Sequence, residues 1–243
     1  MGYQSTFQRY EIKYLLTQQQ KQAILQAMQP YMKLDSYGRT TIRNIYYDTD
    51  TCRLIRRSLE KPAYKEKLRV RSYQAAEAHD PVFVELKKKY RSMVYKRRLT
   101  LPEITVRTCF QNGEPLPVRS QIAQEIEYFR SYYQTLRPTV FLSYEREAFY
   151  ALDGSEFRIT FDENICYRTQ NLLLGEEAYG TALLEEGETL MELKTAGGIP
   201  LWMSHELNRL RVFQTSFSKY GQAYRQMMTA SDGDDERRKC DVC

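Results

Sequence analysis

The chain has 243 residues, of which 42% are hydrophobic and 13% aromatic, so it can bury a sizeable core and is not a mainly disordered protein. A formal net charge of +5 favours an anionic partner, although only weakly. Its five cysteines are scattered, which argues against a disulfide scaffold and indicates a reducing compartment. The sequence shows no secretory leader and no apolar run of membrane-spanning length, so we expect a soluble, cytoplasmic protein.

The predicted elements follow one another without a linker, so we expect a single domain over residues 1–230. Strands are predicted where charged and apolar residues alternate, and helices where apolar residues recur every three or four positions. In chain order the sequence predicts strand 7–16, helix 17–29, strand 41–48, helix 51–59, three strands within 65–99, helices 101–110 and 120–134, strands 138–150, 156–165 and 189–195, and helices 201–210 and 218–228. Residues 231–243 are expected to form a disordered polar tail, in which Cys240 and Cys243 lack a second pair to complete a zinc site.

Residues 65–99 contain three consecutive strands whose cations share one face. In the first strand Lys67, Arg69 and Arg71 alternate with Leu68 and Val70, so charge and apolar bulk point to opposite faces. The next two strands repeat the charged row with Glu85, Lys87 and Lys89, and with Lys96 and Arg98. Like charges on neighbouring strands repel each other, so these rows need either open solvent or an anion.

The same arrangement recurs on strands far away in the sequence. Its members are Arg9, Glu11 and Lys13 on the first strand, Tyr144, Arg146, Arg158 and Asp162 on a predicted hairpin, and Glu192 and Lys194 on the last strand. Each strand has an apolar opposite face that a helix can cover. The sequence therefore predicts an α+β fold, a mainly antiparallel β-barrel with helices on the outside and charge on the inside.

A charged interior predicts the kind of ligand. Unpaired buried charge costs on the order of several kcal/mol per ion, so a barrel with more cations than carboxylates must hold water and a polyanion. Arginine suits phosphate because its planar guanidinium group can donate hydrogen bonds to two oxygens at once. The inward carboxylates of Glu11, Glu85 and Glu192 would repel phosphate unless a divalent cation lies between them, and such oxygen ligands favour Mg²⁺ or Mn²⁺.

Several short motifs, taken in order, carry a family resemblance. They are Arg9-Tyr-Glu11-Ile-Lys13, Leu68-Arg69-Val-Arg71, Val84-Glu85-Leu-Lys87, Tyr144-Glu-Arg146, Arg158-Ile-Thr-Phe-Asp162, Met191-Glu192-Leu-Lys194 and Ser218-Lys219. Over residues 7–228 the chain resembles the polyphosphate polymerase domain of the vacuolar transporter chaperone (VTC) complex, one of the triphosphate tunnel metalloenzymes. The resemblance implies an eight-stranded antiparallel tunnel that makes inorganic polyphosphate from ATP, with Mn²⁺ or Mg²⁺ as cofactor.

The resemblance also implies roles for individual residues. The catalytic cations that would hold the triphosphate and the growing chain are Lys13, Arg69, Arg71, Lys87, Lys96, Arg146 and Arg158. Further substrate-binding residues are Lys67, Lys89, Arg98, Tyr144, Lys194 and Lys219, the last at the tunnel mouth. Glu192 would bind the metal, with Glu11 and Glu85 as supporting carboxylates. The broader superfamily opens with Glu-x-Glu-x-Lys, and Arg9 at the first position fits the polymerase branch.

Two other functions stay open. The same tunnel could hydrolyse triphosphate or a nucleoside triphosphate, with water in place of the chain end. Alternatively, the protein could bind polyphosphate or another polyanion without turnover. The expected partners are ATP, triphosphate and polyphosphate, with no nucleic acid, and a separate membrane subunit is compatible with the sequence.

Overall fold

The computed structural model describes residues 10–91 and 93–240, with only the backbone described for residues 231–240. Within these residues one antiparallel sheet has the strand order β11-β1-β10-β8-β7-β3-β4-β5-β6, while β2 pairs with β7 and β9 with β8. The strands are β1 (Tyr10–Leu16), β2 (Met32–Leu34), β3 (Thr40–Asp48), β4 (Tyr64–Ser72), β5 (Pro81–Tyr90), β6 (Met93–Pro102), β7 (Arg137–Ala151), β8 (Arg158–Arg168), β9 (Thr181–Ala182), β10 (Thr189–Thr195) and β11 (Gln214–Thr215).

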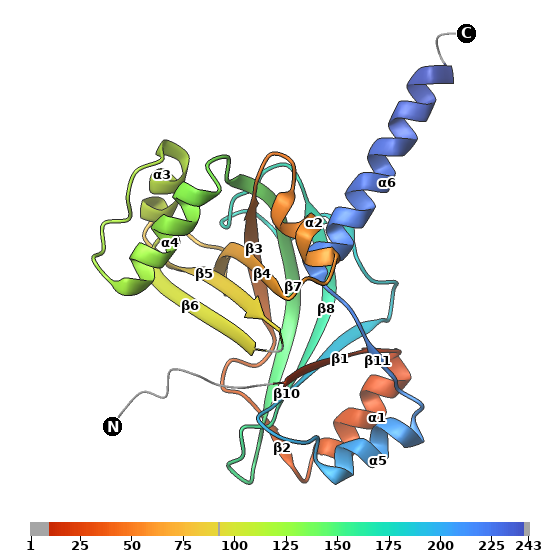
Figure 1. The fold of residues 1–243 in the computed structure, drawn as a ribbon. Coiled ribbons are helices and arrows are strands. Elements are labelled where there is room, and N and C mark those ends of the chain that lie inside the picture. Colours follow the sequence, from red (N-terminus) through yellow and green to blue (C-terminus); the bar gives the residue numbers. More distant parts are fainter. Residues whose placement is uncertain (1–9, 92, 241–243) are drawn as a thin grey trace.

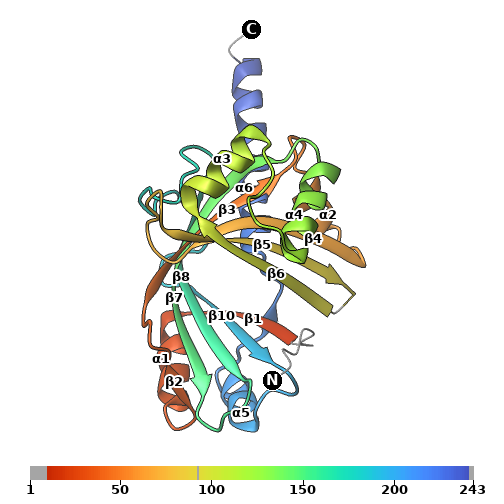
Figure 2. The same ribbon diagram turned by 90° about the vertical axis from the view of Figure 1, so that its left-hand side faces the viewer.

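The sheet bends strongly, so that β5 and β6 face β1 and β10 (Figures 1 and 2). We call the concave side, which carries Arg69, Glu85 and Glu192, the inner face, and the opposite side the outer face. Helices cover the outer face at both ends of the sheet: α3 (Glu103–Asn112) and α4 (Gln121–Tyr132) at one end, and α1 (Gln18–Met28) and α5 (Leu201–Arg209) at the other. α2 (Arg53–Leu59) packs against α6 (Lys219–Cys240).

The predicted α+β fold with an antiparallel sheet is confirmed, but the predicted closed barrel of eight strands is not. The sheet has eleven strands, and no backbone ladder among the described residues joins β6 to β1 or β11. Side chains bridge the two halves instead, as in the ion pair of Lys87 on β5 with Glu11 on β1, at 3.2 Å. Because both facing halves carry rows of cations, their mutual repulsion opposes backbone closure.

Alternation along the strands places the apolar residues on the outer face, as expected. Leu68, Val84 and Leu86 are fully buried in a cluster with residues of α3 and α4. Ile159 and Leu193 are buried in a second cluster with residues of α1 and α5. Burial of both apolar faces leaves the inner face to the charged residues of the same strands.

A β-bulge changes the direction of side chains within β8. The β7–β8 ladder shifts between Ser143 and Glu145, where β8 carries one extra residue. Asn164 in this stretch has a φ of 50°, a conformation that asparagine tolerates better than most residues. As a result Ile165 turns to the inner side and joins an apolar cluster that contains Tyr144 and Tyr220 of α6. One end of the inner face is therefore apolar and covered by α6.

Most predicted boundaries agree with the structure to within a few residues. Thr17 caps α1 in a capping box with Gln20, and Ser120 caps α4. The helix expected from residue 101 begins at Glu103, because β6 continues to Pro102. The short strands β2, β9 and β11 were not predicted. The backbone of α6 continues to Cys240, whereas a disordered polar tail was expected from residue 231, and the disorder of this tail stays a prediction.

Cys243 and the predicted strand residue Arg9 lie outside the described residues. None of the helices in the described part of the chain combines the length and the apolar character needed to cross a bilayer.

Candidate functional site

The buried carboxylate of Glu85 organises the inner face of β4, β5 and β6. The ladder places it directly between Arg69 on β4 and Arg98 on β6, and its side chain is 1% exposed. Its oxygens lie 2.7 Å from Arg69 Nη2, 2.5 Å from Arg98 Nη2 and 2.7 Å from Lys96 Nζ, with Arg71 Nε at 3.9 Å. Burial alone would raise the pKa of Glu85, but Arg69, Arg71 and Lys96 outweigh it and hold the pKa far below its usual value. Glu85 is thus ionised and enclosed by cations.

A row of lysines lies next to Glu85. Lys67, Lys87 and Lys96 are direct cross-strand neighbours on β4, β5 and β6. Three like charges on one row repel one another, and only Lys87 and Lys96 have carboxylate partners within 4 Å among the described residues. Lys67 Nζ instead donates to Ser218 Oγ at 3.2 Å, the hydroxyl that also accepts from Gly221 N in the first turn of α6. This row has unbalanced positive charge that an anion would neutralise.

A second acidic centre lies on β8 and β10. Asp162, fully buried, accepts a bidentate pair of bonds from Arg146 Nε and Nη2, both at 2.6 Å. Lys219 Nζ lies 2.5 Å from Asp162 Oδ2 and 3.6 Å from Glu192 Oε1, so one ammonium group is shared by two carboxylates. Burial would raise the pKa of both acids, but neighbouring cations outweigh it and lower both values. The largest lowering effect comes from Arg146 on Asp162 and from Lys219 on Glu192.

Glu192 connects this centre to the edge of the sheet. Lys13 on β1 is its direct cross-strand neighbour, with Nζ 3.1 Å from Oε1, and Lys13 also donates to the carbonyl of Phe217 at 2.8 Å. Arg146 and Lys194 each lie 3.8 Å from Oε2 of Glu192. Glu192 is therefore surrounded by cations from three strands and from α6.

Two phenols complete the inner face near α6. Tyr46 OH accepts from Arg69 Nη1 at 3.0 Å, and Tyr144 OH accepts from Arg71 Nη2 at 3.2 Å. Burial would raise the pKa of Tyr46, but Arg69, Lys67 and Arg71 outweigh it and lower the pKa to about 8. Both tyrosines thus add oxygen partners that hold the arginines in place on the inner face.

Two lysines of the inner face have pKa values below the ordinary lysine value. Burial lowers the pKa of Lys67 to about 8, against a raising effect of Tyr46. Burial also lowers the pKa of Lys194 to about 8, and Arg146 adds to the effect. Both lysines titrate in a range where Arg69 and Arg146 remain charged.

The structure brings most of the predicted site residues together and leaves two apart. Lys89 faces Lys65 across β4 and β5, and Arg158 is exposed opposite Lys194. Neither forms an ion pair with the inner-face carboxylates described above. Lys219, expected at the tunnel mouth, is instead buried beside Asp162.

Sequence reasoning left several inner-face residues out of the predicted site. Asp162 belongs to the same alternation as Arg158, so the pattern that identified the cations also contained this carboxylate. Tyr46 has no feature in the sequence that distinguishes it from a core tyrosine. Asn44, fully buried, accepts from Arg71 Nε at 2.9 Å, and Ser218 accepts from Lys67. Only the three-dimensional arrangement distinguishes these residues from ordinary core and loop residues.

Asp162 and Glu192 are the carboxylates that best fit a divalent cation. They lie close enough to share the ammonium group of Lys219, so a cation already occupies the position between them. The described residues contain no group of three metal-ligating side chains. Magnesium commonly uses one or two carboxylates and takes its other ligands from water and substrate phosphates. Glu85 fits less well, because arginines and a lysine already cover both of its oxygens.

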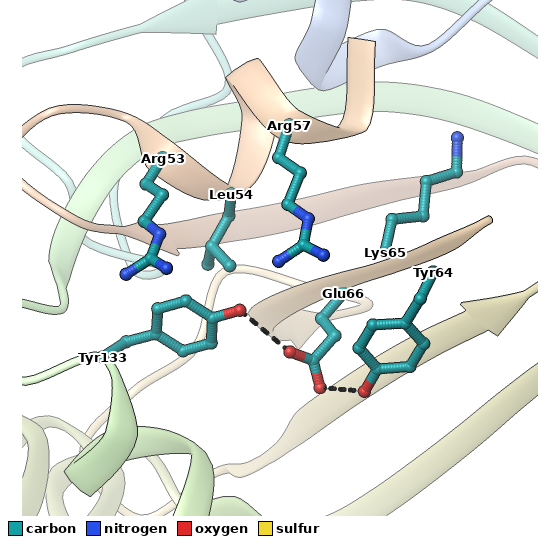
Figure 3. A pocket seen from close by; sticks show the side chains of 7 residues that line it. All are labelled: Arg53, Leu54, Arg57, Tyr64, Lys65, Glu66 and Tyr133. Carbon is teal, nitrogen blue, oxygen red and sulfur yellow. Dashed lines mark hydrogen bonds between the residues drawn. The ribbon is translucent and has the colours of Figure 1, made fainter. Parts of the chain in front are cut away.

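A separate pocket lies between α2, β4 and the end of α4 (Figure 3). Arg53 and Arg57 of α2 point into it. The carboxylate of Glu66 lies below them and accepts from Tyr64 OH at 2.5 Å and Tyr133 OH at 3.0 Å. Because this carboxylate already supplies negative charge, we assign no anion site here.

Comparisons with known proteins agree with this architecture. Solved structures of the same fold include a candidate adenylate cyclase from Bacillus halodurans and a candidate adenylyl cyclase from Hippeastrum that is described as having a dominant triphosphatase activity. Each superposes with a TM-score of 0.53 at 15% identity, over 86% of this chain and 92% of the other. At this identity the likeness establishes a shared fold alone.

The sequence comparisons identify the family. No curated protein sequence matches the chain. The family model of the VTC domain matches residues 8–228, a stretch that contains every described strand and both acidic centres. The chain therefore belongs to the VTC domain family.

Proposed function

We propose that this protein is a polyphosphate polymerase, which transfers the γ-phosphate of ATP to a growing polyphosphate chain and releases ADP. Membership of the VTC family supports it, because proteins of this kind typically act on triphosphates. The observation that carries the proposal is the excess of cations over carboxylates on the inner face. The cations are Lys13, Lys67, Arg69, Arg71, Lys87, Lys96, Arg98, Arg146, Lys194 and Lys219, against Glu11, Glu85, Asp162 and Glu192.

Phosphoryl transfer needs positioning and charge neutralisation more than covalent chemistry. Arg69 and Arg146 are ordered by Glu85 and Asp162, so their remaining donors are fixed in direction before substrate arrives. The lysine row of β4, β5 and β6 provides mobile point charges for the rest of the chain of phosphates. The acceptor oxygen of a polyphosphate end is already ionised, so the reaction requires no general base.

A divalent cation completes the proposal, since proteins of this family are generally metal-dependent. Glu192 and Asp162 would hold it, with Glu11 as a more distant support, whereas the oxygens of Glu85 are already covered by arginines and a lysine. When bound, Mg²⁺ or Mn²⁺ supplies neutralising charge to the phosphate oxygens. Lys13 would keep Glu192 oriented, and Lys219 would add positive charge beside both carboxylates.

Hydrolysis of a triphosphate is the second candidate. The fold shared with the Hippeastrum protein, described as having a dominant triphosphatase activity, favours it. An inner face that no backbone ladder closes among the described residues would also admit water as acceptor. The cytoplasmic location and a separate membrane subunit stay predictions.

Product analysis tests the proposal. Purified protein is incubated with ATP and Mn²⁺, and the products are separated by gel electrophoresis and assayed for free phosphate. Chains of many phosphates with matching release of ADP would support polymerisation, whereas free phosphate without chains would favour hydrolysis. No turnover would leave only a polyanion-binding protein.

Glu192→Gln tests the metal assignment in the same assay. We expect turnover to fall about 100-fold or more and its dependence on Mn²⁺ to weaken, because the variant loses a ligand. Glu125→Gln is the matched control, since Glu125 pairs with Arg97 and Lys88 on the outer face. Unchanged turnover and metal dependence in Glu192→Gln would show that the metal assignment is wrong.

A further inference from the structure

Thr160 lies on the inner face between the residues of the second acidic centre. Alternation along β8 puts it on the same side as Arg158 and Asp162, while Ile159 and Phe161 are buried in the outer apolar cluster. Its direct cross-strand neighbours are Glu192 on β10 and Ala148 on β7. Thr160 therefore lies on the inner side of the sheet, next to Glu192, where the proposed function places a phosphate.

The hydroxyl of Thr160 is buried without a partner. The residue is 5% exposed, and Oγ1 has no hydrogen bond to any described residue. Buried threonines nearby differ, because Thr189 donates to Glu163 at 2.7 Å and Thr195 donates to the carbonyl of Gly198 at 3.1 Å. An unpaired buried hydroxyl costs free energy, so its presence calls for a specific explanation.

The surroundings of Thr160 indicate what could pair with it. The nearby carboxylate of Glu192 is turned toward Lys13 and Lys219, and Asp162 is occupied by Arg146 and Lys219. The surrounding cations have donors only, so they and the hydroxyl can all be satisfied by one group rich in acceptor oxygens. A phosphoryl group is such a group.

We propose that Thr160 is a substrate-contact residue whose hydroxyl donates a hydrogen bond to a non-bridging oxygen of a phosphate bound over β8. The proposal rests on the proposed function. It specifies the position of one phosphate, which would lie between Arg146 and Lys194 and next to Glu192. Thr160 has no part in proton transfer. It adds a short, rigid donor among long, mobile cations, so it sets position rather than overall charge.

Thr160→Val and Thr189→Val form a matched pair of variants for the test. Both replace a buried threonine by an isosteric residue on neighbouring strands. Thr160→Val removes a hydroxyl that has no partner among the residues that the structure describes, so its melting temperature should stay the same or rise. Thr189→Val removes a bonded hydroxyl, so its melting temperature should fall.

Binding of inorganic triphosphate, measured by isothermal titration calorimetry with and without Mg²⁺, supplies the second readout. We expect Thr160→Val to weaken binding roughly tenfold or more, as for loss of a hydrogen bond to a charged group. Thr160→Ser, which restores the hydroxyl, should bind within about threefold of the wild type by the same reasoning. Thr189→Val should bind like the wild type.

The opposite behaviour of the two variants distinguishes substrate contact from a structural role. Equal binding by Thr160→Val and the wild type would overturn the proposal, and so would a fall in its melting temperature as large as that of Thr189→Val. If the wild type binds triphosphate but forms no polyphosphate, polymerisation fails while the contact by Thr160 is still decided by the binding data. If the wild type does not bind triphosphate, both proposals fail.

Discussion

Glu85 and Glu192 carry the same charge on the same face but differ in their surroundings. Cations from the two neighbouring strands β4 and β6 lie within 4 Å of Glu85, and among the described residues they pair with no second carboxylate, whereas Glu192 shares Lys219 with Asp162. Glu85 therefore resembles a built-in substitute for a substrate phosphate, and Glu192 resembles a metal ligand. Substitution of each glutamate by glutamine should therefore have different effects.

Glu85→Gln should destabilise the free protein and strengthen its response to triphosphate. Removing one partner from a buried ion cluster costs about 3–5 kcal/mol, and the partial exposure of Lys96 and Arg98 places this case at the low end. Triphosphate replaces the lost negative charge, so the rise in melting temperature on adding it should exceed that of the wild type. Glu125→Gln on the outer face is the control, and an equal or smaller rise in Glu85→Gln would contradict the substitute role.

The affinity for triphosphate should depend on pH through the titration of Lys67 and Lys194. Their pKa values of about 8 lie below the ordinary lysine value, so the site loses positive charge between pH 7 and 9.5 while the phosphates stay ionised. We expect the affinity for triphosphate to fall roughly tenfold over this range. The double variant Lys67→Arg/Lys194→Arg keeps its charge and should show a flatter profile in calorimetry. A flat profile in the wild type would contradict the assignment.

The free energy of unfolding of the ligand-free protein should rise with pH, whereas the affinity for triphosphate falls. Above about pH 8 the folded state has released protons from these lysines that the unfolded chain still binds, so stability rises with pH. The lowered pKa of Tyr46 acts with the same sign, because the unfolded phenol keeps its proton to about pH 10. A rise in melting temperature between pH 7.5 and 9.5, measured without ligand, checks this expectation.

The residues that could be predicted are those whose side follows from alternation alone. Lys67, Arg69 and Glu192 were placed correctly because a strand with one apolar face allows only one orientation for its charged residues. Tyr46 could not be assigned in this way, since a tyrosine suits a core as well as a polar site. The pairing of Asp162 with Lys219 joins residues far apart in the chain and has no local signal.

Among the elements, the bulge in β8 was invisible in the sequence and has a large effect on the site. It lets Asp162 and Ile165, which are three residues apart, face the same side. The strands β2, β9 and β11 were missed for another reason, because two or three residues are too few to show a period. Long amphipathic helices and long strands were predicted because their patterns repeat several times.

Asn164 should be the residue that the bulge depends on. Its positive φ is strained for a β-branched residue, so Asn164→Val should destabilise the protein by about 1–3 kcal/mol and reduce triphosphate binding by displacing Asp162. Asn164→Gly accepts the same φ and should melt close to the wild type. Thermal melts and calorimetry check both variants, and equal tolerance of valine and glycine would rule out a conformational role.

The arrangement of the two halves of the sheet suggests how substrate acts on the entire fold. Lys13, Arg146 and Lys219 lie in one half, and Arg69, Lys87 and Lys96 in the other, while no backbone ladder joins β6 to β1 among the described residues. The ion pair of Lys87 and Glu11 that spans them is partly exposed, so it contributes little and is screened by salt. A polyanion that contacts both halves would supply the connection that the backbone lacks.

Hydrogen–deuterium exchange measures this connection directly. On adding triphosphate we expect slower amide exchange in β1 and β6 together, because bridging suppresses the local opening that exposes both strands. The helix α3 packs on the outer face and should exchange at an unchanged rate, which makes it an internal control. High salt should remove the protection by weakening the binding of the anion. Protection confined to one half would show that the ligand sits on a single wall, and the two halves would then act as independent surfaces rather than as the sides of one site.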